Sequence, residues 1–196
     1  NYSFIDEFLF NFNLYFFHIN LGIEMINNDS RNVSYNELVK EFKEEAISLT
    51  NHVLTNRQFC DLELLLNGAF QPLDDFMSEN DYNSVLDSMR LKNGKLWPIP
   101  ITLDVDQDFL DSNNIETDSK IALRDKEGFL IAIMTIKDIW KVDRDKEAES
   151  VYNTTDITHP GVKYLFNNIK DYYIGGKLQK VQLPHHYDYQ LLRHSP

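Results

Sequence analysis

Apolar residues recur with helical spacing in three stretches of the first half of the chain, at residues 34–47, 55–66 and 78–89. The first two stretches open with the spacing of a capping box, in which a hydroxyl and a Glu or Gln side chain cap each other's amides (Ser34 with Glu37, Thr55 with Gln58). Asn67-Gly68 supplies a typical C-terminal cap for the second helix. The pattern therefore predicts three amphipathic helices before residue 90.

In the second half of the chain, the pattern of apolar residues changes to one typical of extended strands. Strand-like runs are expected at residues 97–103, 120–124, 129–142, 172–174 and 178–183. Gly175-Gly176 is expected to form the turn between the last two runs, and residues 125–128 the turn of a hairpin. Two further helices are expected near residues 143–152 and 161–169. Helices followed by short strands, without regular βαβ alternation, indicate an α+β fold with a mostly antiparallel sheet.

Residues 1–24 differ in composition from the rest of the chain and hold a large share of its 13 phenylalanines. The stretch lacks the basic start and small-residue cleavage site of a secretory signal, and polar residues interrupt it too often for a membrane-spanning helix. We expect it to be foreign to the domain, either upstream reading-frame translation or a stray extension, so that the domain comprises residues 25–196. The alternative is an apolar tail that docks on a partner or a membrane surface.

Length and charge narrow the possible functions. With 196 residues the chain can form one domain with a proper core, and 19 basic against 31 acidic residues give a net charge of −12. So acidic a surface repels phosphate backbones, and we expect no nucleic-acid partner. Cys60 is the single cysteine, which excludes an internal disulfide and a thiolate zinc site. We expect a soluble cytoplasmic domain with no membrane partner and no structural metal.

Two short motifs resemble ligand-binding sites but lack residues that such sites require. Residues 104–108 begin like a calcium loop, but Phe109 and Ile115 stand where that loop needs a glycine and a bidentate glutamate. Residues 175–178 (Gly-Gly-Lys-Leu) lack the first glycine and the hydroxyl residue of a phosphate-binding loop, because Asp171 and Leu178 occupy those positions. We therefore predict no metal-binding and no cofactor-binding residue in this chain.

The other polar candidates are assigned structural roles. Acidic residues near the third helix are expected to be solvated or to lie at the helix N-terminus: Asp74, Asp75, Glu79 and Asp81. Cys60 is expected to be a small buried residue within the second helix. No catalytic residue is predicted among them.

The histidines suggest no metal pair, since none lie three or four residues apart; they are His18, His52, His159, His185, His186 and His194. His159 precedes Pro-Gly at a helix start, where we expect it to cap or pack. His185-His186 follows a proline and is expected to be a loop pair with one ring partly buried.

A series of longer blocks runs from residue 54 to the end of the sequence. They include Leu-Thr-Asn-Arg-Gln-Phe-Cys-Asp-Leu-Glu-Leu-Leu-Leu-Asn-Gly-Ala-Phe at 54–70, Leu-Trp-Pro-Ile-Pro-Ile-Thr-Leu-Asp at 96–104, Ile-Ala-Leu-Arg-Asp at 121–125, His-Pro-Gly-Val at 159–162 and Gly-Gly-Lys-Leu at 175–178. In this order and combination, the blocks resemble the N-terminal domain of ATP sulfurylase (sulfate adenylyltransferase).

The resemblance implies a PUA-like β pseudo-barrel decorated with helices, in agreement with the α+β prediction. It also implies a parent enzyme, a homo-oligomer, that joins ATP and sulfate into adenosine 5′-phosphosulfate and pyrophosphate with magnesium. In the family this chemistry belongs to the next domain, through a Gln-Thr-Arg-Asn-Pro and a His-x-x-His segment, neither of which occurs here. What the resemblance implies is a scaffold whose partner is the catalytic domain of the same parent chain. Mg-ATP is then implied for the parent only, and this chain is expected to be inactive alone.

Two other functions stay open. PUA domains elsewhere recognise RNA, and a stand-alone RNA-binding module should present Lys and Arg along one face. A non-catalytic assembly subunit would instead bind a separately encoded catalytic chain.

Overall fold

The computed structural model describes residues 35–188, 194 and 196. The chain divides into two units, residues 1–38 and 39–196, and nearly all of the described structure belongs to the second. The predictions for residues 1–24 and for the cap at Ser34 lie outside the described residues.

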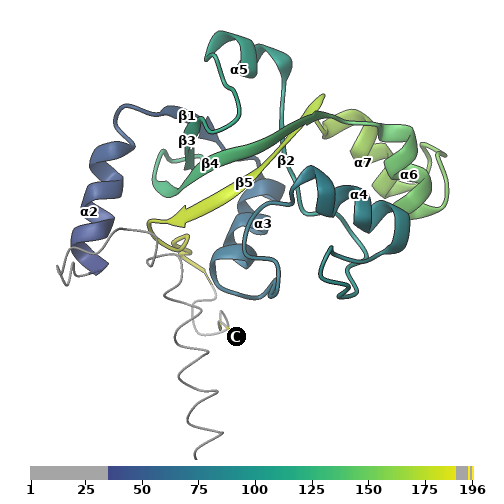
Figure 1. Ribbon diagram of the computed structural model, residues 1–196, viewed down its shortest axis with the longest axis horizontal. Coiled ribbons are helices and arrows are strands. Elements are labelled where there is room, and N and C mark those ends of the chain that lie inside the picture. Colours follow the sequence, from purple (N-terminus) through teal and green to yellow (C-terminus); the bar gives the residue numbers. More distant parts are fainter. Residues whose placement is uncertain (1–34, 189–193, 195) are drawn as a thin grey trace, which may run out of the picture. The chain divides into compact units, whose positions relative to one another are not determined.

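A five-stranded mixed sheet forms the centre of the second unit, in the order β1-β3-β4-β5-β2. Its strands are β1 (Thr50–Val53), β2 (Leu103–Val105), β3 (Lys120–Arg124), β4 (Leu130–Lys141) and β5 (Tyr172–Lys180). Only the β1–β3 pair is parallel, and the long strands β4 and β5 run antiparallel through the middle (Figure 1). The sheet curls into a half-barrel, and the prediction of an α+β fold with a mostly antiparallel sheet is confirmed.

Six helices accompany this sheet in the described part of the chain: α2 (Tyr35–Glu45), α3 (Asn56–Leu66), α4 (Glu79–Ser88), α5 (Gln107–Ser112), α6 (Arg144–Tyr152) and α7 (Pro160–Asn168). The predicted capping box of α3 is present, since Thr55 accepts from the Gln58 amide while the Gln58 side chain caps the Thr55 amide. Ser78 caps α4 through the amide of Asp81. The sequence therefore predicts the starts of these two helices correctly.

The apolar core lies in the hollow of the curled sheet, under α3 and the loop that follows it. Its largest fully buried members include Leu54, Leu62, Phe76, Leu103, Ile121, Met134 and Ile136. A second cluster lies between α4, α6, α7 and the far ends of β4 and β5, and it includes Tyr82, Trp140, Ala148, Val162, Leu165 and Tyr173. The two clusters meet along β5, so this strand carries side chains of both.

The predicted turn at Gly175-Gly176 is wrong, because β5 runs without a break from Tyr172 to Lys180. The glycines instead allow close backbone approach in mid-strand. A Cβ at Gly175 would lie 2.2 Å from the carbonyl oxygen of Met77, and one at Gly176 would lie 2.1 Å from that of Thr135. The partner strand β4 has a bulge at the same level, so two glycines in a strand mark a crowded bulge here.

Two elements were not predicted. β1 is a four-residue edge strand without strong alternation. α5 begins within the stretch that resembles a calcium loop, where Asp106 caps the helix through the amide of Phe109. Conversely, only Leu103 of the extended run 97–103 joins the sheet. Prolines 98 and 100 carry no amide hydrogen, which explains why this run stays outside the ladder.

Gly176→Ala should lower the free energy of unfolding by about 2–3 kcal/mol, because the new methyl group meets a strand carbonyl that cannot move independently. Gly94→Ala is the control: its backbone has φ +83°, but open space surrounds the added methyl, so the loss should be about 1 kcal/mol. Urea unfolding of both variants measures the difference. Equal losses would show that the crowding at Gly176 is unimportant.

Candidate functional site

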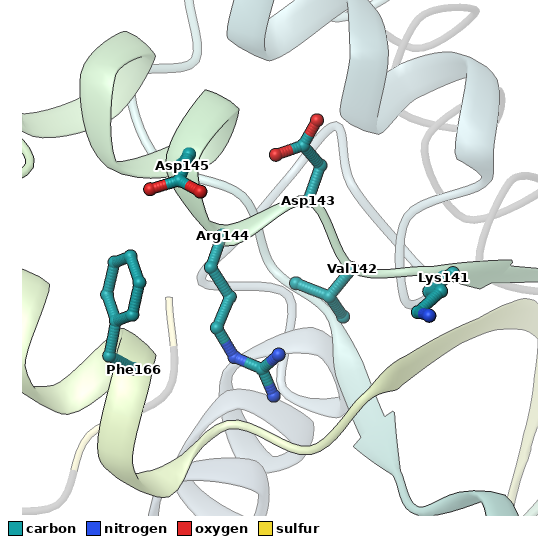
Figure 2. A pocket seen from close by; sticks show the side chains of 6 residues that line it. All are labelled: Lys141, Val142, Asp143, Arg144, Asp145 and Phe166. Carbon is teal, nitrogen blue, oxygen red and sulfur yellow. The ribbon is translucent and has the colours of Figure 1, made fainter.

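An open hollow of about 570 Å³ lies where β4 passes into α6. Its lining consists of Lys141, Val142, Asp143, Arg144, Asp145 and Phe166 (Figure 2). Two acidic and two basic side chains make the lining neutral, and Arg144 is already engaged by the carbonyl of Ile169 (2.8 Å) and the carboxylate of Asp171 (2.9 Å). A polyphosphate needs several convergent cations, so this hollow does not fit a nucleotide.

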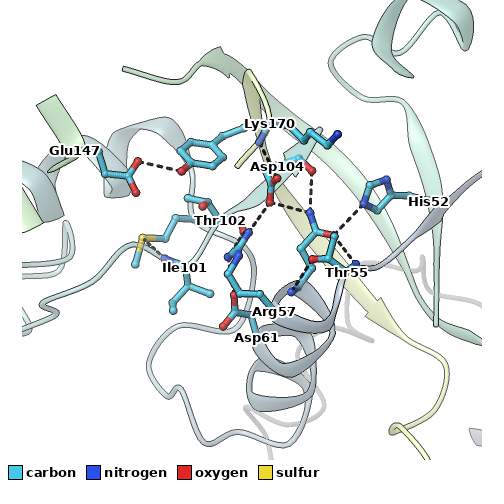
Figure 3. A network of polar contacts seen from close by, with 12 residues as sticks. His52, Thr55, Arg57, Asp61, Ile101, Thr102, Asp104, Glu147 and Lys170 are labelled. Carbon is cyan, nitrogen blue, oxygen red and sulfur yellow. Dashed lines mark hydrogen bonds and ion pairs between the residues drawn. The ribbon is translucent and has the colours of Figure 1, made fainter. Parts of the chain in front are cut away.

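A network of polar side chains, centred on Arg57 of α3, connects this helix with both edge strands of the sheet (Figure 3). Arg57 donates from Nη2 to Asp104 Oδ1 at 2.5 Å and from Nη1 to Asp61 Oδ2 at 2.8 Å. Both terminal nitrogens also reach the carbonyl of Thr102 at 3.2 Å. Burial opposes the charge on Arg57, but the two carboxylates outweigh it and raise the pKa of the guanidinium. Arg57 is therefore held as a cation.

Asp104 of β2 joins three separate parts of the chain. Besides Arg57, its carboxylate accepts from Gln58 Nε2 at 2.8 Å and from the amide of Lys170 at 3.0 Å, just before β5. Gln58 Nε2 also donates to the Asp104 carbonyl at 2.8 Å. The carboxylate is 4% exposed. Three protein donors thus already occupy this carboxylate: Arg57 and Gln58 at Oδ1 and the Lys170 amide at Oδ2.

His52 extends the network to the opposite edge of the sheet. Its Nε2 lies 3.4 Å from Gln58 Oε1, and its ring packs edge-on against Phe109 of α5 with centroids 5.2 Å apart. Burial lowers the pKa of His52, although Gln58, Asp104 and Asp106 favour the charged ring. The edge strands β1 and β2, which share no ladder, are therefore linked through Gln58.

A second buried carboxyl, Glu147 of α6, lies beyond this network. The hydroxyls of Tyr82 and Tyr173 donate to its Oε2 at 2.9 and 3.0 Å, and Trp140 packs against both tyrosine rings. Burial raises the pKa of Glu147 and the pKa values of both tyrosines. This cluster connects α4 and α6 with the first residues of β5. Its two tyrosine hydroxyls both donate to Glu147.

In chemical terms, the network fixes paired charges in position and contains no reactive group. The cation of Arg57 faces two carboxylates, and burial raises the pKa of Asp61 even though Arg57 lowers it. Among the described residues, no group of three or more His, Cys, Asp or Glu side chains gathers as a metal site. No described helix has the length and apolar character needed to cross a bilayer.

Several of the residues assigned structural roles behave as predicted. His159 caps α7 by accepting from the amide of Val162 at 3.4 Å. His186 is partly buried and lies 2.8 Å from Glu63 Oε1, while His185 is exposed. Glu79 and Asp81 stand in the first turn of α4, as expected from the helix dipole.

Two of these assignments are wrong. Cys60 lies within α3, but on its exposed side, because the buried stripe of that helix runs through Gln58, Leu62 and Leu65. Asp75 is not a solvated carboxylate: it accepts from the amide of Leu178 at 2.7 Å, and burial raises its pKa. Asp75 thus holds the loop after α3 against β5, whereas its neighbour Asp74 is exposed.

Sequence reasoning missed the network itself, although one signal was present. Asp104 stands alone between the apolar residues Leu103 and Val105, and an isolated charge within a buried run requires a partner. The sequence does not show that the partners are Arg57 and Gln58, almost fifty residues earlier.

Asp104→Ala should destabilise the protein by about 3–5 kcal/mol. It removes a buried carboxylate that pairs with Arg57, and it leaves the Gln58 side chain and the Lys170 amide without this acceptor. Asp118→Asn serves as control, because it removes the charge of a carboxylate that is 70% exposed and pairs with Lys137 on the surface, a pair worth about 0–1 kcal/mol. Asn also tolerates the left-handed backbone of that position, where φ is 68°. Denaturant unfolding of both variants tests the contrast, which disappears if the buried network carries no stability.

Glu147→Gln should become more stable relative to wild type as pH rises. Because burial raises the pKa of Glu147, its contribution to stability is full below the ordinary glutamate pKa and is lost as pH rises through the folded pKa. Unfolding free energies measured between about pH 4 and pH 8 report the difference. Glu149→Gln, on the exposed side of the same helix, should track wild type; a Glu147→Gln curve that is also parallel to wild type would contradict the argument.

Comparison with known proteins agrees with the fold. Residues 27–183 match the family model of the PUA-like domain. The sulfate adenylyltransferase of Saccharomyces cerevisiae is 50% identical over 161 residues, which are 82% of this chain and 30% of that protein. The corresponding protein of Mycosarcoma maydis is 45% identical over 160 residues, 81% of this chain and 28% of that protein. The resemblance to sulfate adenylyltransferases is confirmed, and the chain spans less than a third of the length of these relatives.

One solved structure, described as a hexameric APS kinase from Thiobacillus denitrificans, superposes on this chain with a TM-score of 0.61 at 30% identity. The superposition covers 81% of this chain and 27% of that one. The family match over most of the sequence, together with the curled mixed sheet, shows that this chain belongs to the PUA-like domain family.

Proposed function

We propose that this chain forms the PUA-like framework of a sulfate adenylyltransferase, and that the reaction itself takes place on other residues of the parent enzyme. The parent would join Mg-ATP and sulfate into adenosine 5′-phosphosulfate and pyrophosphate. The observation that carries the proposal is the identity of 45–50% to sulfate adenylyltransferases over four fifths of this chain.

The charge arrangement supports a framework role. A site for sulfate beside a triphosphate must bring several cations to one place. In the described part of the chain, Arg57 is neutralised by two carboxylates and the hollow beside α6 carries as many acids as bases. These residues do not fit Mg-ATP, so no step of the reaction is assigned to them.

The partners belong to the same proposal. Relatives more than three times the length of the matched region support a larger parent chain as the immediate partner. A homo-oligomeric parent finds support in the hexamer named for the APS kinase neighbour. Location in the cytoplasm rests on the single cysteine. The RNA-binding alternative is not favoured, since a net charge of −12 opposes a phosphate backbone.

Purified residues 25–196 should release no pyrophosphate from ATP in a sulfate-dependent way, since the residues that the structure describes gather no cluster of cations for the two anions. A chimera tests the framework role directly: residues 27–183 replace the matching region of the Saccharomyces cerevisiae enzyme, and pyrophosphate release should be retained. The same chimera carrying Asp104→Ala should lose activity on heating before the unmodified chimera does. Turnover by the isolated chain, or a folded but inactive chimera, would refute the proposal.

A further inference from the structure

The segment between α4 and β2 has a charge opposite to that of the rest of the chain. Residues 89–99, here called the basic hairpin, contain three cations and no carboxylate: Arg90, Lys92 and Lys95. All 31 acidic residues of the chain lie outside this segment. In the described structure, the ammonium groups of Lys92 and Lys95 take part in none of the ion pairs, and both side chains are exposed.

The basic hairpin also exposes apolar side chains beside these cations. Met89, Leu96 and Ile99 are 53%, 65% and 51% exposed, and Pro98 between them is exposed as well. Exposed large apolar side chains close in the chain to charged ones are typical of a protein interface. A phosphate polymer would use the cations but leave the apolar residues uncovered, so the mixed surface favours a protein partner.

The hairpin is held in one conformation before any partner binds. Arg90 and Leu96 form an antiparallel bridge, Trp97 N donates to Met89 O at 2.8 Å, and Arg90 Nη1 donates to Gly94 O at 2.9 Å. Leu91 anchors the hairpin in the core, and Trp97 packs edge-on against Phe70 with ring centroids 5.6 Å apart. A preorganised surface loses little conformational entropy on binding.

We propose that the basic hairpin docks on an acidic surface of a second copy of this chain. A protein of net charge −12 supplies the complementary charge, and no other stretch between two successive carboxylates of the sequence holds as many as three cations. The inference rests on the homo-oligomer of the proposed function, but not on its chemistry.

The complementary surface is formed by α5 and the turn after it. Residues 104–119 contain no Lys or Arg, and three of their carboxylates are exposed without an ion pair in the described structure: Asp108, Asp111 and Glu116. Half-buried Phe109 lies among them as an apolar contact. The α5 helix stands apart from α4 and the segment that follows it in Figure 1, so hairpin and acceptor are different surfaces. Such head-to-tail contacts close into rings or extend into chains.

Sedimentation velocity of the full 196-residue chain over a wide concentration range, at physiological ionic strength where long-range repulsion is screened, measures the association. Lys92→Glu with Lys95→Glu should weaken it by about tenfold or more, because like charges then face each other. Leu96→Ser with Ile99→Ser should weaken it as well. The control pair Lys126→Glu and Lys163→Glu changes the net charge equally at other exposed positions, and should have a much smaller effect.

A charge exchange tests which surfaces meet. Asp111→Lys with Glu116→Lys should also weaken association, and the protein carrying both this pair and the lysine-to-glutamate hairpin pair should associate again. A wild-type chain that is monomeric throughout, an oligomer insensitive to the hairpin pair, or a failure of the combined variant to recover would each overturn the proposal. None of these outcomes bears on the proposed reaction, which the chimera assay measures by pyrophosphate release.

Discussion

The half-barrel depends on how a curled sheet with two open edges is closed. β1 and β2 end opposite sides of the sheet and share no backbone hydrogen bonds, so a side chain must span the gap. Gln58 does so, because its oxygen faces His52 and its amide nitrogen donates to Asp104. The Arg57–Asp104 pair then fixes α3 over the seam. A buried ion pair is costly to desolvate, but once formed it penalises any arrangement that separates its members, and this makes the closure specific.

The crowding around Gly175 and Gly176 is a consequence of the same closure. As the sheet curls, the loop after α3 approaches β5 until the Met77 carbonyl leaves no room for a side chain at Gly175. Asp75 then accepts from the Leu178 amide and fixes the loop at that distance. Glycine in a strand costs conformational entropy, which the hydrogen bond and the burial of Phe76 against the strand offset.

Local features of this chain could be predicted, and distant pairings could not. The capping box at Thr55 involves residues three apart, and both hydrogen bonds that it implies were found. Gln58 illustrates both cases. Its role in the capping box follows from residue spacing, whereas its hydrogen bond to Asp104 joins residues 46 apart and depends on the curl of the sheet. The local signal of Gly175-Gly176 fits both a turn and a crowded strand, and only the tertiary contact distinguishes the two. The exposure of Cys60 depends on which side of α3 faces the sheet, and the sequence of the helix alone does not specify that.

The more deeply placed cations of this domain are paired with carboxylates. Arg57 is matched by Asp61 and Asp104, Arg144 by Asp171, and the excess of acid is left on the surface. An enzyme that handles sulfate and a triphosphate must keep cations unpaired until its substrates arrive, and unpaired buried cations are destabilising. A parent protein gains if stability and anion binding are placed in different domains, because neither then compromises the other. Under the proposed function, the paired network around Arg57 is what such a division would leave in the supporting domain.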